Sequence, residues 1–310
     1  MTGFGWLRVL LLLTATVGAV PAPAAEPPRS GVPGALGSEG APQRRQDWLE
    51  PTQDPVTLSR AVLFRPAGKG PFRLAVIAHA STQNRLRRAQ MPQPDYPALA
   101  AALVARGFAV LVPQRPGHGA TGGPYLEDQD GCDDAHYAMS ARTTADTIMA
   151  ALDFMRTQPF IARDGAVVVG HSAGGWGALA LATESPRSIA AIVAFAPGRG
   201  GRADNRPGQI CAPEKLVAAA RQFGEHAQVP VTWLVADNDS YFPPAFSQRL
   251  VDAFAEAGGK ATFRVLPPFG AEGHWLAEAG DGALLDPLLA GAVGTGARTP
   301  LAQGAGAKKK

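Results

Sequence analysis

The segment AVVVGHSAGGWGALALAT (residues 166–183) decides the fold. Its apolar start, Ala166–Val169, has the length and β-branched composition of a buried strand, and its end, Gly175–Thr183, is typical of a helix. Between them, GHSAG (residues 170–174) matches the pattern G-x-S-x-G. A strand-to-helix turn this tight strains the backbone at Ser172 and tolerates only small neighbours, which explains the glycines and alanine around it. The alternative is a glycine-rich turn in which the serine only caps the helix.

Strand-like and helix-like segments alternate along the chain on both sides of this turn. The apolar runs predict strands at residues 56–64, 72–78, 108–112, 166–169, 189–195, 231–236 and 261–266. The periodicity predicts helices at residues 96–106, 143–157, 175–183 and 245–257. Strands without polar alternation, separated by helices, indicate an α/β fold with a mostly parallel sheet and helices on both faces. The carboxyl ends of such strands share one edge, where sites of open α/β sheets lie.

Ser172 can act as a nucleophile only with a base and a carboxylate that orients the base. Asp237 and Asp239 follow the strand at 231–236, and His274 follows the strand at 261–266. The order serine, acid, histidine is the one that this architecture uses. Of six histidines, only His274 follows the last predicted strand. Either aspartate can instead cap a turn, and a histidine can be an ordinary core or surface residue.

The motifs GHSAGG (170–175), ADNDSYFP (236–243) and GHW (273–275), in this order, resemble the α/β-hydrolase superfamily. They are most similar to its dienelactone-hydrolase-like and prolyl-oligopeptidase-like branches, over about residues 56–290. The resemblance implies the α/β-hydrolase fold with a short lid insertion, and a catalytic triad of Ser172, Asp239 and His274. The resemblance favours Asp239 over Asp237, because the position of Asp239 relative to Pro243 matches the family pattern. It requires no metal and no organic cofactor.

The resemblance also implies an oxyanion hole, a pair of backbone N–H groups that stabilise a developing negative charge. Ala173, at the start of the helix, supplies one N–H. His79-Ala80-Ser81-Thr82 occupies the place of the family's His-Gly segment, so the N–H of Ser81 or Thr82 supplies the other. Ala80 replaces the usual glycine. The segment RPGHGATGG (115–123) resembles a second family loop, with Pro116 and Thr121 as departures, and we expect it to be structural.

An insertion at about residues 197–228 lies where the family commonly places a lid. Its arginines can bind a substrate carboxylate or belong to a solvated polar loop: Arg199, Arg202 and Arg206. Five aromatic residues beside the site segments are candidates for an acyl or aryl pocket, or for the core: Tyr125, Trp176, Tyr241, Phe242 and Trp275.

The amino terminus has the pattern of an export signal. Arg8 precedes the apolar run 9–20, and Ala22-Pro23-Ala24 supplies small residues for cleavage before Ala25. We therefore expect a signal peptide at 1–24 and a periplasmic or secreted protein with no stable membrane span after cleavage. An uncleaved anchor is the alternative. Composition predicts a flexible Pro/Gly-rich segment at 25–46, the hydrolase domain at 47–290 and a disordered tail at 291–310.

The chain has two cysteines, Cys132 and Cys211, both in loops at the expected rim of the site. In an exported protein a disulfide between them is reasonable and would hold the lid, with two free thiols as the alternative. Two cysteines cannot form a Cys₄ zinc site.

Composition restricts the function. The 310 residues carry a net charge of only +3, which is too small to indicate a nucleic-acid partner. The sequence predicts an exported serine hydrolase that cleaves a small-molecule carboxylic ester through an acyl-enzyme. The alternatives are a small peptidase or amidase of the prolyl-oligopeptidase type, and a non-catalytic binding protein on a hydrolase scaffold. The oligomeric state stays open.

Overall fold

The computed structural model describes residues 31–293. The predicted signal peptide (1–24) and residues 294–310 of the predicted tail lie outside the described residues. Within residues 31–293 no helix is both long enough and apolar enough to cross a membrane.

The centre of the described chain is a nine-stranded sheet with the order β1-β2-β3-β5-β4-β6-β7-β8-β9. The strands are β1 (Gly34–Gly40), β2 (Arg45–Pro51), β3 (Leu58–Phe64), β4 (Arg73–Ala78), β5 (Phe108–Gln114), β6 (Ala166–His171), β7 (Ile189–Phe195), β8 (Val231–Ala236) and β9 (Ala261–Leu266). β1, β2, β3 and β5 pair antiparallel, and all pairs from β5 across to β9 are parallel. The predicted mostly parallel sheet is therefore confirmed.

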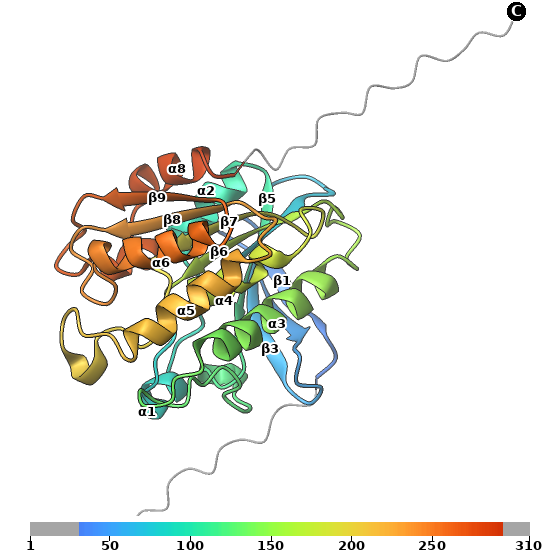
Figure 1. The fold of residues 1–310 in the computed structure, drawn as a ribbon. Helices are drawn as coiled ribbons and strands as arrows, with labels where there is room; N and C mark the ends of the chain where they lie inside the picture. The colour runs from blue at the N-terminus through green and yellow to red at the C-terminus, as the bar shows by residue number, and fades with distance from the viewer. Residues whose placement is uncertain (1–30, 294–310) are drawn as a thin grey trace, which may run out of the picture.

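Helices cover both faces of the sheet (Figure 1). One face carries α3 (Tyr137–Met155), α4 (Ala173–Ala180), α5 (Pro213–Gly224) and α6 (Pro244–Glu256). The other face carries α2 (Pro97–Ala105), α7 (Leu276–Ala279) and α8 (Gly282–Ala290). The short α1 (Arg85–Ala89) and four 3₁₀ turns complete the described helices: η1 (Gly119–Thr121), η2 (Leu181–Thr183), η3 (Ala203–Asn205) and η4 (Gly273–Trp275).

Burial on both faces explains the continuous apolar runs of the central strands. In β4, Leu74 and Val76 pack into the core beside α3 and α4, whereas Ala75 and Ile77 pack into the core beside α2. Both sets of side chains are buried away from water, so apolar residues are favoured on both faces of the strand.

The amino-terminal segment differs from the expectation. Residues 25–46 were expected to be flexible, but they include β1 and the start of β2. β1 (GALGSEG) is mostly exposed, so the antiparallel backbone hydrogen bonds to β2 define this strand, and hydropathy gives no signal for it. β2 is anchored by Trp48, which is buried against Phe154 and Phe160. The ordered fold therefore begins before residue 47.

The insertion at about 197–228 divides into two parts with different roles. Its second part forms α5, whose Leu216, Ala219 and Phe223 are buried in the core beside α6 and α3. α5 is amphipathic and belongs to the helical layer. It is therefore not part of a lid, contrary to the expectation for the whole insertion. Only the first part, around residues 198–211, lies over the cavity described below.

Candidate active site

A cavity of about 790 Å³ opens at the carboxyl edge of the parallel strands. Loops that follow five different strands line it: residues 80–84 after β4, 172–173 after β6, 198–205 after β7, 241–242 after β8 and 274–275 after β9. Right-handed crossovers bring these loops together, although they are distant in the sequence. The volume is in the range of small-molecule sites.

Ser172 occupies the sharp turn between β6 and α4. Its backbone has φ 53° and ψ −118°, a strained conformation for a residue with a side chain. The turn is possible only because its neighbours are small. A Cβ atom on Gly174 would lie 2.1 Å from the backbone oxygen of Ala78 on β4. The Ser172 side chain faces the cavity, and α4 begins directly after it.

Asp239 and His274 form a buried pair, with Asp239 Oδ2 3.0 Å from His274 Nδ1. The other carboxylate oxygen, Oδ1, accepts hydrogen bonds from the backbone N–H groups of Tyr241 and Phe242, both at 2.8 Å. Three donors thus fix the Asp239 carboxylate. Asp237 is exposed, and the structure therefore brings only Asp239 to the histidine.

Neighbouring rings and backbone groups fix the His274 imidazole. The Tyr241 ring stacks on it, with ring centres 4.1 Å apart and an angle of 18° between the planes. The His274 backbone N–H donates to Glu272 Oε1 at 3.1 Å. Its backbone oxygen accepts a hydrogen bond from His171 Nε2 at 2.7 Å. With Nδ1 directed at Asp239, the Nε2 side of the ring is left for another partner.

Ser172 and His274 both line the cavity. Within residues 31–293 the Ser172 hydroxyl has no hydrogen-bond partner. Catalytic hydrogen bonds of unliganded sites are often long or poorly aligned and tighten when substrate binds.

The expected oxyanion loop after β4 also lines the cavity. The N–H of Ala80 donates to the Tyr96 hydroxyl at 3.2 Å, so this group is already occupied. In the described part of the chain, the N–H groups of Ser81, Thr82 and Ala173 donate to no protein acceptor. These three residues border the cavity, as the sequence predicts for oxyanion donors.

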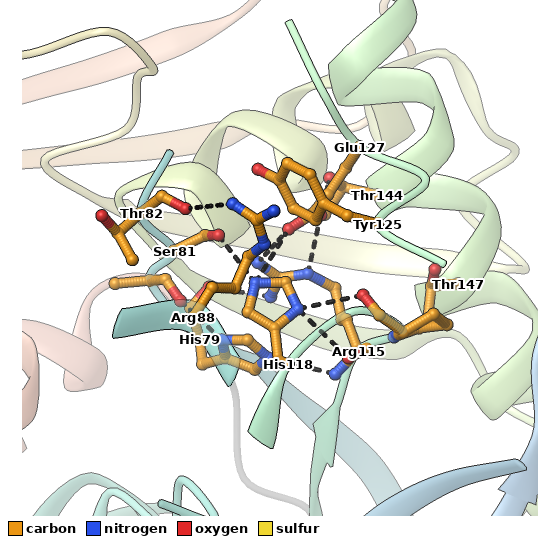
Figure 2. Close-up of polar contacts among 12 residues, drawn as sticks. His79, Ser81, Thr82, Arg88, Arg115, His118, Tyr125, Glu127, Thr144 and Thr147 are labelled. Carbon is orange, nitrogen blue, oxygen red and sulfur yellow. Dashed lines mark hydrogen bonds and ion pairs between the residues drawn. The ribbon is translucent and has the colours of Figure 1, made fainter. Parts of the chain in front are cut away.

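A buried ion-pair network lies behind this loop (Figure 2). Arg115 holds Glu127 through two hydrogen bonds, Nε–Oε2 at 2.8 Å and Nη2–Oε1 at 3.0 Å. Arg199 lies 3.0 Å from Glu127 Oε2, and the Thr144 hydroxyl also donates to this oxygen. Burial alone would raise the pKa of Glu127, but the charges of Arg115 and Arg199 lower it well below its usual range. Glu127 was not found from the sequence, because no motif marks it.

The arginines of the insertion have different roles. Arg199 also lines the cavity, but it is buried and paired with Glu127, so its charge is already neutralised within the network. Arg202 lines the cavity and lies 3.2 Å from Glu272 and 3.0 Å from Ser240 Oγ. Arg206 is exposed and does not line the cavity.

The aromatic candidates also separate into two groups. Tyr241, Phe242 and Trp275 line the cavity. Trp176 is fully buried and donates from its indole nitrogen to the Tyr137 backbone oxygen at 3.0 Å, so it belongs to the core. Tyr125 packs in the buried network, with the Arg88 guanidinium 3.4 Å from its ring centre.

Cys132 and Cys211 are joined by a disulfide in the structure, and both residues line the cavity. The bond connects the loop before α3 to the loop before α5. It therefore attaches the part of the insertion over the cavity to the main body of the domain.

Solved structures share this fold at low sequence identity. An acetyl xylan esterase from Paenibacillus sp. R4 is 14% identical with a TM-score of 0.55, covering 77% of this chain and 83% of its own. A cold-adapted esterase from an Arctic intertidal metagenomic library is 21% identical with a TM-score of 0.52, covering 82% and 98%. An acylaminoacyl peptidase from Pyrococcus horikoshii is 11% identical with a TM-score of 0.54, covering 82% of this chain and 40% of its own.

The sequence comparison agrees with the fold. Residues 94–223, which include Ser172, match the family described as serine aminopeptidase, S33. No curated protein matches the chain. The family match and the fold together support a hydrolase enzyme, and the resemblance predicted from the motifs is confirmed.

Proposed function

We propose that this chain, a member of the α/β-hydrolase superfamily, is an exported serine hydrolase that cleaves carboxylic esters through an acyl-enzyme intermediate. One observation carries the proposal. His274, whose Nδ1 lies 3.0 Å from Asp239 Oδ2, borders the same cavity as Ser172, which sits at a strained turn with φ 53°. A nucleophile, a base and an orienting carboxylate in this arrangement are what acyl transfer requires.

The arrangement supports the following reaction. Ser172 Oγ attacks the ester carbonyl while His274 Nε2 takes its proton, and Asp239 stabilises the imidazolium that forms. The N–H of Ala173, with that of Ser81 or Thr82, stabilises the oxyanion of the tetrahedral intermediate. His274 then gives its proton to the leaving alcohol, which frees the alcohol and leaves the acyl group on Ser172. Water, deprotonated by His274, hydrolyses this acyl-enzyme and restores the serine.

The cavity favours a small or medium-sized substrate with an apolar part. Its volume of about 790 Å³ is large enough for a drug-sized molecule. Tyr241, Phe242, Trp275 and Met91 supply apolar wall beside the proposed nucleophile. We expect an acyl or aryl group to bind against these side chains, because burial of apolar surface stabilises the complex.

The exported location rests on two features. The amino-terminal sequence has the pattern of a cleavable signal peptide. The Cys132–Cys211 disulfide is typical of proteins in an oxidising compartment, such as the bacterial periplasm or the medium. Detection of the mature chain, starting at Ala25, in an extracytoplasmic fraction tests this part of the proposal.

A second candidate function is a peptidase or amidase, and the family match over residues 94–223 favours it. The same triad can cleave an amide, provided that His274 protonates the leaving amine. Paired p-nitrophenyl esters and p-nitroanilides with identical acyl groups distinguish the two, since only the leaving group differs.

The experiment that tests the proposed function uses the mature form from Ala25. Hydrolysis of p-nitrophenyl esters from acetyl to dodecanoyl is measured for the wild type, Ser172→Ala and the control Ser185→Ala, which changes an exposed serine. We expect Ser172→Ala to lose ester hydrolysis and fluorophosphonate labelling, and Ser185→Ala to keep both. Equal activity in wild type and Ser172→Ala would refute the assignment of the nucleophile. Absence of hydrolysis and labelling in the wild type would favour a binding role.

A further inference from the structure

We propose that His118 is a positioning residue for the oxyanion hole, holding the Ser81 hydroxyl so that the N–H groups of Ser81 and Thr82 stay directed at the cavity. The inference rests on the proposed function and adds a residue to it. His118 touches neither the cavity nor the triad, and it acts through the loop after β4.

The first observation is the contact itself. His118 Nε2 lies 2.7 Å from Ser81 Oγ. His118 Nδ1 lies 3.1 Å and 3.0 Å from the backbone oxygens of Arg115 and Pro116. Backbone oxygens only accept hydrogen bonds, so Nδ1 carries the proton and Nε2 is the acceptor. The Ser81 hydroxyl therefore donates to His118.

The His118 ring is suited to this role because it is buried and neutral. Its side chain is 0% exposed and packs edge-on against His79 and Tyr125. Burial lowers the pKa of His118 to about 4, with Arg115 adding to the decrease and Glu127 opposing it. Glu127 Oε1 lies 3.4 Å from Nε2, but this carboxylate is already neutralised by Arg115 and Arg199.

A second contact holds the other end of the loop. Arg88 Nη1 donates to the backbone oxygen of Thr82 at 2.9 Å and of Gln83 at 3.2 Å. The Arg88 guanidinium rests on the face of Tyr125, which also contacts the His118 ring (Figure 2). Ala80 is fixed by Tyr96 through its N–H. Side chains from the surrounding structure thus bind the Ala80 N–H, the Ser81 hydroxyl and the Thr82 oxygen, whereas in the described part of the chain the N–H groups of Ser81 and Thr82 have no protein acceptor.

The support for the loop is itself rigid. Arg115 donates from Nη1 to the backbone oxygen of His79 at 2.8 Å, and its own N–H donates to His79 Nε2 at 3.1 Å. Arg115 also makes the two hydrogen bonds to Glu127 that anchor the network. His118 therefore connects Ser81 to the backbone of Arg115, which forms a buried ion pair with Glu127. An oxyanion hole gains its effect from such preorganisation, because no reorganisation is needed when the charge develops.

The test compares His118→Ala, His118→Gln, Ser81→Ala and the double variant His118→Ala/Ser81→Ala. Each is assayed with the best p-nitrophenyl ester and with a trifluoromethyl ketone of the same acyl group. This inhibitor forms an oxyanion on the nucleophile and so reports directly on the hole. We expect His118→Ala to lower kcat about 10- to 100-fold and to weaken the inhibitor by a similar factor, with KM changed less than about 2-fold.

Two further comparisons separate positioning from general stability. Ser81→Ala removes only a hydroxyl and should lower kcat and inhibitor affinity as much as His118→Ala does. The double variant should lower them no further, because both substitutions break the same hydrogen bond. His118→Gln keeps an acceptor and should recover most of kcat. His226→Ala, which changes an exposed histidine, should leave all values unchanged.

The inference would be overturned by a Ser81→Ala variant with unchanged kcat and inhibitor affinity, or by losses that add in the double variant. Thermal unfolding of each variant shows whether a loss of activity is caused by loss of the folded state. If His118→Ala does not fold, Ser81→Ala still tests the inference. Failure of the proposed function is a different result: the wild type itself would then show no hydrolysis and no labelling.

Discussion

His171 Nε2 donates a hydrogen bond to the backbone oxygen of His274, 2.7 Å away. The two residues are 103 positions apart in the sequence. The Nδ1 atom of the same ring lies 3.0 Å from the Tyr96 hydroxyl, which in turn accepts from the Ala80 N–H. A buried chain of hydrogen bonds therefore connects the proposed oxyanion loop, the residue before the proposed nucleophile and the backbone of the proposed base.

Replacement of His171 by Phe tests this chain. Phe keeps an aromatic ring but leaves the His274 oxygen without its His171 donor and the Tyr96 O–H without its acceptor. A buried unsatisfied group costs about 1–3 kcal/mol. We expect the free energy of unfolding to fall by about this amount and kcat to fall with it. Urea unfolding and ester hydrolysis measure the two effects. Tyr96→Phe removes the hydroxyl to which the Ala80 N–H and His171 Nδ1 are bonded, so it should lower the free energy of unfolding as well. An unchanged His171→Phe variant would contradict the role.

Acid should destabilise the protein. Burial lowers the pKa of His171 to about 3, and the nearby His274 adds to the decrease. Burial also lowers the pKa of His118 to about 4. In the unfolded chain both histidines titrate near about 6.5. Between these values the unfolded state binds more protons, so stability falls as the pH decreases from about 6.5 towards 4. Urea unfolding at pH 7, 6, 5 and 4 checks this, and His118→Gln should flatten the dependence.

Glu50 should destabilise the protein in the opposite pH direction. It is fully buried, and within residues 31–293 neither carboxyl oxygen has a hydrogen-bond partner. Burial raises the pKa of Glu50 well above the usual value. The folded state thus keeps the proton to a higher pH than the unfolded state. The associated stability is complete below about 4.5 and is lost as the pH rises through the folded pKa.

Glu50→Gln mimics the protonated carboxyl at every pH. We expect it to melt at a higher temperature than the wild type at pH 8 and at the same temperature at pH 4. Glu225→Gln, an exposed glutamate, is the control and should change neither value. A Glu50→Gln protein that is less stable than the wild type at pH 8 would show that the buried carboxylate is ionised and compensated.

The disulfide should contribute to stability. Cys132 and Cys211 are 79 residues apart, and closing a loop of this size typically stabilises a protein by about 2–4 kcal/mol. We expect Cys132→Ser/Cys211→Ser to lower the free energy of unfolding by this amount. Dithiothreitol should weaken the wild type and have no effect on the double variant. Equal stability of the two oxidised proteins would argue against a structural role of the bond.

The two aspartates after β8 should behave differently. Asp239→Asn keeps the geometry but removes the charge that would stabilise a His274 imidazolium, and the same change lowers kcat about 10⁴-fold in a serine protease triad. Asp237→Asn changes an exposed side chain and should leave kcat within about 2-fold. Steady-state ester hydrolysis by the two purified variants decides between them. A larger loss for Asp237→Asn would reverse the assignment.

The sequence predicted the central strands well because their physical signal is local. β6, β7 and β8 lie in the centre of the sheet with both faces covered, so their residues are mostly apolar. β1 could not be predicted in this way, since its side chains are exposed and its pairing with β2 uses backbone groups that every residue has. The position of the insertion alone predicts a lid at α5, whereas the helical spacing of Leu216 and Phe223 indicates a helix with one buried face.

By itself, the sequence determined the turn at Ser172 and the order in which acid and base follow it, because a tight strand–turn–helix depends on small residues within a few positions. Only the tertiary structure decided that Asp239 and not Asp237 meets His274, that Arg199 is neutralised by Glu127, and that His118 holds Ser81. These contacts join residues that are 35, 72 and 37 positions apart in the sequence. Their distances are set by how the sheet and its loops pack, and no local sequence pattern marks them.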